Sequence, residues 1–333
     1  MKLRIAIDMG SCSTKIYVLG NGVVLCEPSV VAVRNEKGQI VIKAIGLAAK
    51  KMLGKTAENI SVIFPVESGE IVDEIMAVEM LKYFTSKITA DGHAKIHATF
   101  TTVCNLSAEE RGKFYRVGAA AGISVIDFAE SAMCLSLGLH IPLSEFSPCF
   151  IADIGGGVTN IAALNLLGIM SGVSVCIGGN NIDDYLVDFI DKNFNLKIGR
   201  LSAEKLKLDI GSLVENDISS FVLSGRDSNS GKPKNLPVTA KALYPAVSHY
   251  YQLISDIIKD ILSKLEPETT GEIIKSGIYI AGGSGLLYGV CEFLESRLFV
   301  PVHLTEDPQL AVILGAGVLI GSPELCKSLT FGV

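Results

Sequence analysis

Short apolar runs and longer amphipathic stretches follow one another along the whole chain. Runs of about four to eight apolar or alternating residues predict strands, and apolar residues spaced three and four apart predict helices. The predicted strands are residues 3–7, 15–19, 23–26, 29–33, 39–42, 96–103, 125–128, 148–152, 161–167, 173–177, 277–281 and 302–304. The predicted helices are residues 73–88, 107–121, 130–138, 182–193, 202–213, 239–265, 286–298 and 308–320. Together these elements favour an α/β fold.

Two polar segments interrupt this pattern. Residues 225–237 are polar and rich in glycine, so they predict a surface loop. Residues 142–148 begin and end with proline and predict the connection between two halves of the chain.

One sequence of elements occurs twice. The strand at 3–7 ends at Asp8, and a glycine-containing turn and a hairpin follow. The strand at 148–152 ends at Asp153, and Gly155, Gly156, Gly157 and a second hairpin follow. This repeat predicts a tandem duplication, which agrees with a length of 333 residues, too long for one ordinary domain.

Composition narrows the class of protein. Apolar residues make up 49% of the chain, so core material is plentiful. The net charge of −6, without a basic run, gives no reason to expect a nucleic-acid partner. The 8 cysteines are scattered and form no C-x-x-C pair, which predicts small buried side chains in a reducing compartment.

The ends of the chain carry no targeting or spanning signal that we can identify. The N-terminus enters a strand at once and has no apolar core of a signal peptide. The apolar stretch at 310–320 is far shorter than the roughly 20 residues that span a bilayer. We therefore expect a cytoplasmic protein whose membrane contact, if it has one, is peripheral.

Three glycine-rich turns after strands are the strongest candidates for a binding site: residues 8–14, 153–159 and 281–285. Glycine leaves backbone N–H groups open to a phosphate, and an aspartate at a strand end can hold a metal ion beside it. Each turn alone is equally consistent with an ordinary tight connection. Together they favour a nucleotide site in which two turns hold the phosphates and Asp8 and Asp153 hold one Mg²⁺. The third turn would open a helix that faces the nucleoside or the α-phosphate.

This arrangement resembles the superfamily of actin, heat-shock chaperones and sugar kinases. Within it the chain looks like a divergent member of the MreB family of bacterial actin-like cell-shape proteins, over almost all of its length. The segments that carry the resemblance are Asp8-Met9-Gly10-Ser11, Cys26-Glu27-Pro28-Ser29-Val30-Val31-Ala32, Ala49-Lys50-Lys51-Met52-Leu53-Gly54-Lys55-Thr56, Asp153-Ile154-Gly155-Gly156-Gly157, Ile177-Gly178-Gly179, Ala203-Glu204-Lys205-Leu206-Lys207, Ala281-Gly282-Gly283-Ser284 and Glu306-Asp307-Pro308.

The resemblance implies an actin-like (ribonuclease-H-like), duplicated two-domain fold with a nucleotide cleft between the domains. Domain I would comprise residues 1–141 and 308–333, with a smaller subdomain at about 32–72. Domain II would comprise residues 142–307, with a smaller subdomain at about 184–240.

The resemblance also implies residue roles in binding and hydrolysing Mg-ATP. Asp8 and Asp153 would position Mg²⁺, and Glu130 would orient the attacking water, so that Glu130, Asp153 and Thr159 form the catalytic set. The cofactor-binding residues would be Gly10, Ser11, Cys12, Ser13 and Thr14 in the first turn, Gly155, Gly156, Gly157 and Val158 in the second, Gly179 near the ribose, Glu204 and Lys207 at the ribose and adenine edge, and Gly282, Gly283 and Ser284 beside the adenosine. From the residues alone, Glu204 and Lys207 are equally consistent with an exposed ion pair one helical turn apart.

The chain departs from the family pattern where hydrolysis is concerned. Val158 stands where the family has a threonine that positions the hydrolytic water, and Ser131 replaces the proline after the catalytic glutamate. Valine cannot hydrogen-bond, and phosphoryl transfer depends mainly on positioning and charge. We therefore expect ATP binding with slow hydrolysis, a weak Mg-dependent ATPase.

The expected function is that of a filament-forming bacterial actin homologue that governs cell shape, with further copies of itself as partners. A membrane-binding loop would lie at residues 86–95, where one aliphatic candidate and two lysines predict weak affinity or help from membrane-protein partners. Two other classes stay open. One is a small-molecule kinase of the same superfold; the other is a non-polymerising nucleotide-binding adaptor or a plasmid-segregation actin.

Overall fold

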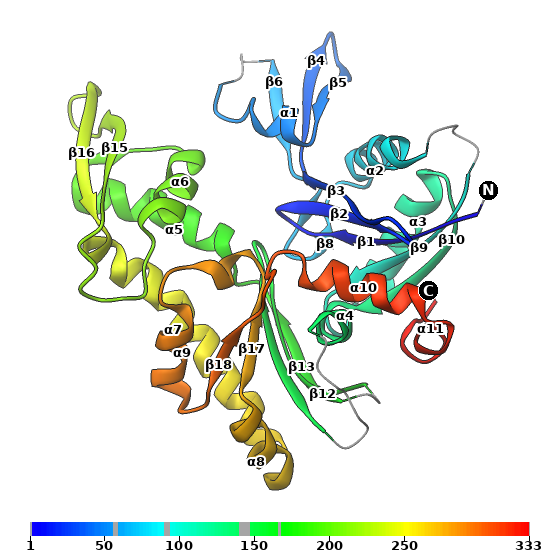
Figure 1. Ribbon diagram of the computed structural model, residues 1–333. Coiled ribbons are helices and arrows are strands. Elements are labelled where there is room, and N and C mark those ends of the chain that lie inside the picture. The colour runs from blue at the N-terminus through cyan, green and yellow to red at the C-terminus, as the bar shows by residue number, and fades with distance from the viewer. Residues whose placement is uncertain (1, 56–58, 90–93, 140–146, 166–167, 333) are drawn as a thin grey trace.

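Two five-stranded mixed sheets form the centres of the two halves of the molecule (Figure 1). This computed structural model describes residues 2–55, 59–89, 94–139, 147–165 and 168–332. The strand orders are β10-β9-β1-β2-β3 and β13-β12-β11-β17-β18. In both sheets the central strand pairs antiparallel with the next strand in the chain and parallel with a later one. The second sheet thus repeats the topology of the first, which confirms the predicted duplicated α/β fold.

The strands of the first sheet are β1 (Lys2–Met9), β2 (Ser13–Val18), β3 (Gly22–Pro28), β9 (Lys95–Thr102) and β10 (Ile123–Glu130). Those of the second are β11 (Cys149–Ile154), β12 (Thr159–Asn165), β13 (Gly168–Val175), β17 (Ile278–Ala281) and β18 (Val302–Leu304). Ile5, Ala6 and Ile7 of β1 and residues 149–152 of β11 are buried and apolar because helices cover these central strands.

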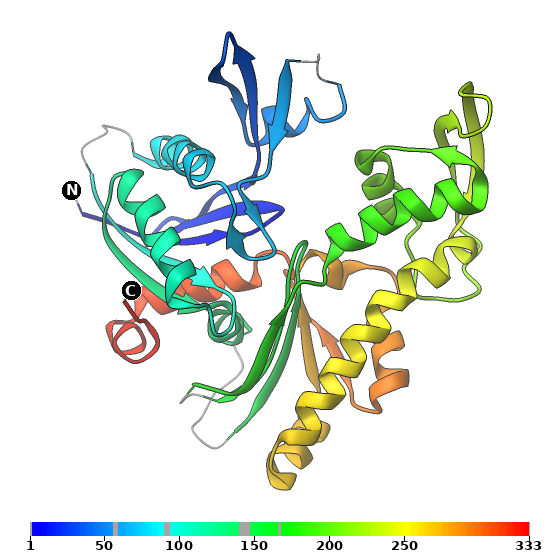
Figure 2. The same ribbon diagram turned by 180° about the vertical axis from the view of Figure 1, so that it is seen from behind.

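Helices cover the sheets on both sides. In the first half these are α2 (Glu74–Ile88) and α3 (Ala108–Ala120), whose N-terminal amides are capped by Asp73 and Ser107. In the second half they are α5 (Gly179–Phe194), α6 (Arg200–Ile210), α7 (Ala240–Lys264), α8 (Pro267–Ser276) and α9 (Val290–Leu298). The long helix α7 runs beside the second sheet, as Figure 2 shows from behind.

A shared core joins the two halves. It is built by α4 (Ser131–Gly138) and α10 (Ala311–Gly321), with α11 (Pro323–Leu329) at its edge, and it includes Ala6 of the first sheet and Ile151 of the second. The backbones of α4 and α10 touch, since a Cβ atom on Gly315 would lie only 1.6 Å from the carbonyl oxygen of Cys134. Only glycine permits this approach, which fixes the two sheets relative to one another.

Two small sheets project from the upper ends of the halves in Figure 1. One contains β4 (Val31–Glu36), β5 (Gln39–Ile45) and β6 (Ile60–Ile63), beside the short helix α1 (Leu47–Lys50). The other contains β14 (Leu196–Lys197), β15 (Ser220–Asp227) and β16 (Pro233–Thr239). A two-stranded hairpin, β7 (Val66–Glu67) and β8 (Glu70–Ile71), returns the chain to the first half.

The predicted surface loop at 225–237 is therefore wrong, because most of it belongs to β15 and β16. Leu223 and Val238 are buried on one face of this hairpin, and its other face is solvated, which explains the high polar content. Two prolines are tolerated because β16 is an outer strand of its sheet.

The expectation of buried cysteines holds only in part. Cys104, Cys134 and Cys149 are buried, but Cys12, Cys26 and Cys176 are exposed. Cys12 lies in the turn between β1 and β2, Cys26 lies in β3, and Cys176 lies between β13 and α5.

Some predictions fall on residues outside the described ranges. These are residues 142–146 of the predicted connection, including the proposed domain boundary, residues 90–93 of the candidate membrane loop, and the last two residues of the strand predicted at 161–167. Within the described ranges no single helix is long and apolar enough to cross a membrane. Only α10 and α11 taken together pass that test of length and composition, and they are bent by 111°.

Candidate functional site

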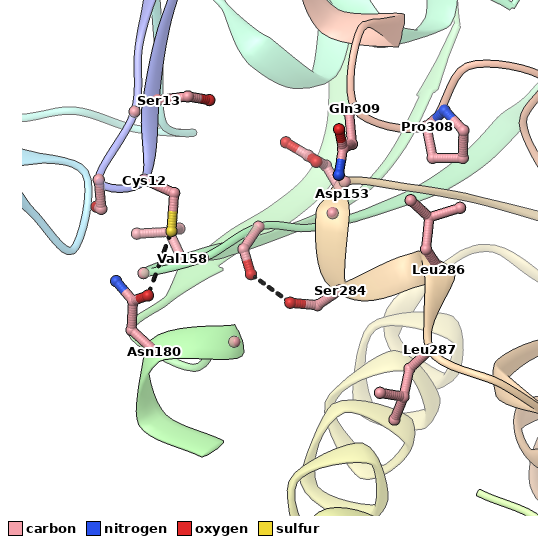
Figure 3. A pocket seen from close by; sticks show the side chains of 18 of the residues that line it. Cys12, Ser13, Asp153, Val158, Asn180, Ser284, Leu286, Leu287, Pro308 and Gln309 are labelled. Atoms are coloured by element: carbon pink, nitrogen blue, oxygen red, sulfur yellow. Dashed lines mark hydrogen bonds between the residues drawn. The ribbon is translucent and has the colours of Figure 1, made fainter. Parts of the chain in front are cut away.

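A cavity of about 820 Å³ lies between the two halves, and all three glycine-rich turns line it. The β1–β2 turn comes from one side, the β11–β12 turn faces it, and the N-terminus of α5 and the segment 282–288 close the other side. Figure 3 shows this arrangement, with Cys12 and Asn180 reaching toward one another. The three turns that the sequence singles out are therefore one site.

The first two turns have the same backbone geometry. The N–H of Gly10 donates to the carbonyl of Ser13 at 3.1 Å, and the N–H of Gly155 donates to the carbonyl of Val158 at 2.9 Å. A Cβ atom on Gly155 would lie 2.7 Å from that carbonyl oxygen, so this tight turn requires glycine.

The two turns also touch one another across the cavity. A Cβ on Gly156 would lie 2.1 Å from Sγ of Cys12, and one on Gly157 would lie 2.5 Å from Oγ of Ser11. The thiol of Cys12 donates to Oδ1 of Asn180 at 3.2 Å. Glycines at 156 and 157 thus let the halves approach. Although Cys12 is exposed to the cavity, the surrounding turns partly desolvate its thiol and raise its pKa.

The two aspartates lie at the ends of the central strands with different partners. Asp8 accepts hydrogen bonds from Lys15 at 2.8 Å and from Thr101 at 3.0 Å. Asp153 accepts from the amide of Asn160 at 3.3 Å. Burial raises the pKa of Asp153 to about 6, the charge of Asp8 acts in the same direction, and Lys15 and Asn160 oppose the shift.

Lys15 is a site residue that the sequence reading missed. It is buried, and although burial lowers its pKa, the contact with Asp8 raises it overall, so the side chain stays charged. The signal was available, because the hairpin register places Lys15 directly opposite Asp8.

The donor set fits a hard divalent cation. Within the described residues no group of three or more His, Cys, Asp or Glu side chains could hold a metal ion by itself. Two carboxylates remain, Asp8 and Asp153. Burial, and after it the charge of Asp8, raises the pKa of Asp153, so a cation bound beside it would stabilise its charged form. Mg²⁺ is commonly held in this way, by one or two carboxylates together with water and phosphate oxygens.

The third turn packs against the second. Gly282 has φ of 83°, and a Cβ there would lie 2.3 Å from the carbonyl oxygen of Ile154. The hydroxyl of Ser284 donates to the carbonyl of Gly155 at 2.9 Å, and Tyr251 donates to the carbonyl of Ser284 at 2.6 Å. Gly283 lies with them along the cavity.

The predicted helix at 286–298 is wrong at its start. Gly283–Leu286 forms a short 3₁₀ helix, η1, and α9 begins only at Val290 after Gly289 in the left-handed conformation. No α-helix therefore begins directly after the third turn. The backbone of η1 lies there in its place.

Glu204 and Lys207 both line the cavity, but they do not form the exposed pair with one another that the residues alone allow. Lys207 contacts Asp183 at 2.8 Å and donates to the carbonyl of Gly179 at 2.8 Å. Glu204 contacts Lys50 of the other half at 2.8 Å. The structure thus brings Gly179 and Lys207 together, whereas Glu204 pairs with Lys50 of the other half.

Three predicted residues lie behind the cavity wall. Thr14 bonds to Ser29, and Thr159 donates to the carbonyl of Ile177 at 2.6 Å; both side chains are buried. Glu130 ends β10, and its Oε1 accepts the N–H of Asn105 at 3.2 Å. Among the described lining residues its neighbour Ser131 is present and Glu130 is not.

Val158 lies in an apolar part of the wall. A Cβ on Gly69 would lie 2.6 Å from Cγ1 of Val103 and 3.2 Å from Cγ2 of Val158, so both valines converge on this glycine. Ser68 and Gly69 have φ of 50° and 80°, which matches a type I′ turn between β7 and β8. This hairpin tip therefore closes the wall next to the second turn.

Comparison with known proteins agrees with this fold. Residues 2–328 match the family described as MreB/Mbl protein. The chain belongs to the MreB/Mbl family. It is 31% identical over 321 residues to the cell shape-determining protein MreB of Pasteurella multocida, covering 94% of this chain and 91% of that protein. It is 30% identical over 322 residues to the cell shape-determining protein Mbl of Bacillus subtilis, covering 96% of each.

Two solved structures superimpose closely on this chain. The crystal structure of MreB 5 of Spiroplasma citri bound to AMPPNP has a TM-score of 0.91 at 28% identity and covers 98% of this chain and 97% of that one. A MamK double helical filament has a TM-score of 0.82 at 20% identity and covers 97% and 99%, which establishes the actin-like fold alone.

Proposed function

We propose that this MreB/Mbl protein binds ATP with Mg²⁺ between its two halves and assembles with copies of itself into cytoskeletal filaments that govern cell shape. The observation that carries the proposal is the convergence of three glycine-rich turns and two aspartates on one cavity. Relatives with this fold include proteins named for cell-shape determination, a structure bound to AMPPNP and a double helical filament.

In this proposal the first two turns bind the phosphates through backbone N–H groups and through Ser11 and Ser13. Asp8 and Asp153 hold Mg²⁺, which supplies the charge that the phosphates require. Gly179 and Lys207 lie beside the ribose, and the third turn lies beside the adenosine. We assign residues 1–141 and 308–333 to domain I and residues 142–307 to domain II, with the small sheets as subdomains at about 32–72 and 184–240.

We further propose that hydrolysis is slow. Val158 and Val103 place methyl groups at the wall where a hydroxyl would orient water, and Glu130 is held by the N–H of Asn105. Positioning of the nucleophile is most of what a protein contributes to phosphoryl transfer. The site is thus suited to binding ATP more than to cleaving it.

The proposed location is the cytoplasm. Contact with the inner face of the membrane would use the loop at 86–95 or a membrane-protein partner, and Lys87 already contacts Glu27 and Tyr83, which leaves it less available to lipid headgroups. We therefore place self-assembly first among the partners of the chain.

The experiment is sedimentation of the purified chain with ATP, with ADP and without nucleotide, each with Mg²⁺, followed by electron microscopy of the pellets. We expect pelleted filaments with ATP and fewer without nucleotide. A chain that binds ATP but never pellets would favour the adaptor class. Rapid ATP turnover that depends on a sugar or carboxylate acceptor, without filaments, would favour the kinase class and overturn the proposal.

A further inference from the structure

Two charged side chains from opposite halves meet at the edge of the cavity. Lys50 ends α1 of the first half, and Glu204 lies in α6 of the second. Nζ of Lys50 lies 2.8 Å from Oε1 of Glu204, and both residues line the cavity. They are 154 positions apart in the sequence, so this ion pair joins the two halves directly.

Two further contacts flank this ion pair. The guanidinium of Arg200 lies over the ring of Phe64, 5.7 Å from its centroid. Cδ1 of Leu201 would lie 3.9 Å from a Cβ on Gly54, so these residues are neighbours. All these contacts join Lys50, Gly54 and Phe64 to α6. We call them the cleft bridge, which consists of Lys50, Gly54, Phe64, Arg200, Leu201 and Glu204.

The helix that carries Lys50 is itself fixed to the first half. Oε2 of Glu27 accepts the N–H of Leu47 at 2.9 Å, and its Oε1 binds Lys87 of α2 at 2.5 Å. Gly46 has φ of 67°, and a Cβ there would lie 2.1 Å from the Glu27 carboxylate, so the approach requires glycine. Because α1 cannot follow α6 freely, separation of the two small sheets must break the ion pair of Lys50 with Glu204.

We propose that the cleft bridge is a latch that controls how fast nucleotide leaves the cavity. This inference rests on the proposed function, because it concerns the nucleotide of that site. A ligand held between the two halves leaves when they separate, and the bridge holds α1 and α6 together at the edge of its path. Glu204 then acts on the nucleotide through Lys50, in contrast to the direct ribose contact that the family resemblance implies.

The size of the effect follows from exposure. The side chains of Lys50 and Glu204 are 39% and 30% exposed, so water screens their attraction. Loss of such a pair changes an equilibrium or a rate by about three- to fivefold. We expect faster release of that size, and a release rate of the wild-type chain that rises with salt because salt screens partly exposed charges.

The experiment measures release of fluorescent N-methylanthraniloyl-ATP, with Mg²⁺, after rapid mixing with excess ATP. The variants are Lys50→Ala, Glu204→Gln, both together, and the exchange Lys50→Glu with Glu204→Lys. The matched control is Lys51→Ala, since Lys51 is the exposed neighbour of Lys50. Thermal melting of each variant checks that it is folded.

We expect each single variant to release nucleotide about three- to fivefold faster, the double variant to be no faster than either, and the charge exchange to restore most of the slow release. Lys51→Ala should behave as wild type. Unchanged release in the single variants would overturn the latch. Faster release in Glu204→Gln but not in Lys50→Ala, or additive effects without rescue by the exchange, would overturn it and favour direct contact of Glu204 with the ribose. A wild-type chain that takes up no nucleotide would instead overturn the proposed function, and the latch with it.

Discussion

The two turns that face one another across the cleft have the same backbone hydrogen bond but different side chains. Each begins with a glycine N–H that donates to the carbonyl three residues later, as in Gly10 to Ser13 and Gly155 to Val158. The first turn has a hydroxyl at that later position, and the second has an isopropyl group. Duplication has therefore preserved the feature that binds anions, the exposed backbone, and the side chains have separated into different tasks.

The strands that follow the turns differ in charge. Lys15 lies opposite Asp8 in the first copy, and Asn160 lies opposite Asp153 in the second. One aspartate therefore has a cationic partner, and the other has a neutral amide and a raised pKa. The comparison teaches that the first copy supplies positive charge to the cleft, and that the second supplies a carboxylate whose charge Lys15 offsets only in part, so that a bound cation would stabilise it further.

Replacing Lys15, the positively charged side chain opposite Asp8, should have the largest effect of the substitutions that we propose. Lys15→Met leaves two carboxylates without their common positive neighbour, and breaking a buried pair from one side costs about 3 kcal/mol. We expect that loss of unfolding free energy in chemical denaturation, and ATP affinity reduced by about tenfold or more, since the remaining charge repels phosphate.

The residue at the equivalent place of the second copy provides the control. Asn160→Ala removes the hydrogen bond that Asn160 donates to Asp153 and the one that it accepts from Ser174, and each should cost about 1 kcal/mol. Equal losses of stability in the two variants would contradict the division of charge between the copies.

The difference between Ser13 and Val158 should govern turnover. Val158→Thr gives the second turn the hydroxyl that the first already has, so we expect phosphate release to rise by about tenfold, because a positioned hydroxyl orients the water. Binding of ATP should change little, since the backbone of the turn is unaltered.

The reciprocal variant sharpens the test. Ser13→Val removes one donor from the first turn and should weaken ATP binding by about fivefold, the effect of one hydrogen bond, without faster turnover. If Val158→Thr releases phosphate at the wild-type rate, the apolar wall is not what slows hydrolysis.

The parts of this site that could be predicted from the sequence are those that depend on neighbouring residues, and the parts that could not depend on contacts between distant segments. The turns at Asp8, Asp153 and Gly282 were predictable, because glycine runs after apolar strands are local signals, and the duplication follows from their order. Lys15 was overlooked because a lysine on a strand usually faces solvent, and only the pairing of β1 with β2 places it against Asp8. The contact of Lys50 with Glu204 joins distant segments, so local pattern could not indicate it.

The same limit applies to the errors in the fold. Residues 225–237 are polar as loops are, yet they pair as strands because one face packs on α6 and α7. The polar residues indicate that the other face is exposed to solvent. From the sequence alone they cannot distinguish a hairpin with one solvated face from a loop, because the helices that cover the buried face lie far away in the chain.

The two aspartates should respond to neutralisation with opposite sign, and this is the smallest effect that we expect. The pKa of Asp153 is raised from 3.8 to about 6, so the folded chain keeps this proton to higher pH than the unfolded chain. Between pH 3.8 and about 6 the free energy of unfolding of the ligand-free protein falls through this group as pH rises.

Asp153→Asn should therefore stabilise the ligand-free chain at pH 7.5 and hardly at all near pH 4, where this carboxyl group is largely protonated in the folded chain. Asp8→Asn should destabilise it, because Lys15 then loses its partner. Chemical denaturation without Mg²⁺ or nucleotide at the two pH values measures both, and destabilisation by both variants at pH 7.5 would show that the two copies carry the same charge balance.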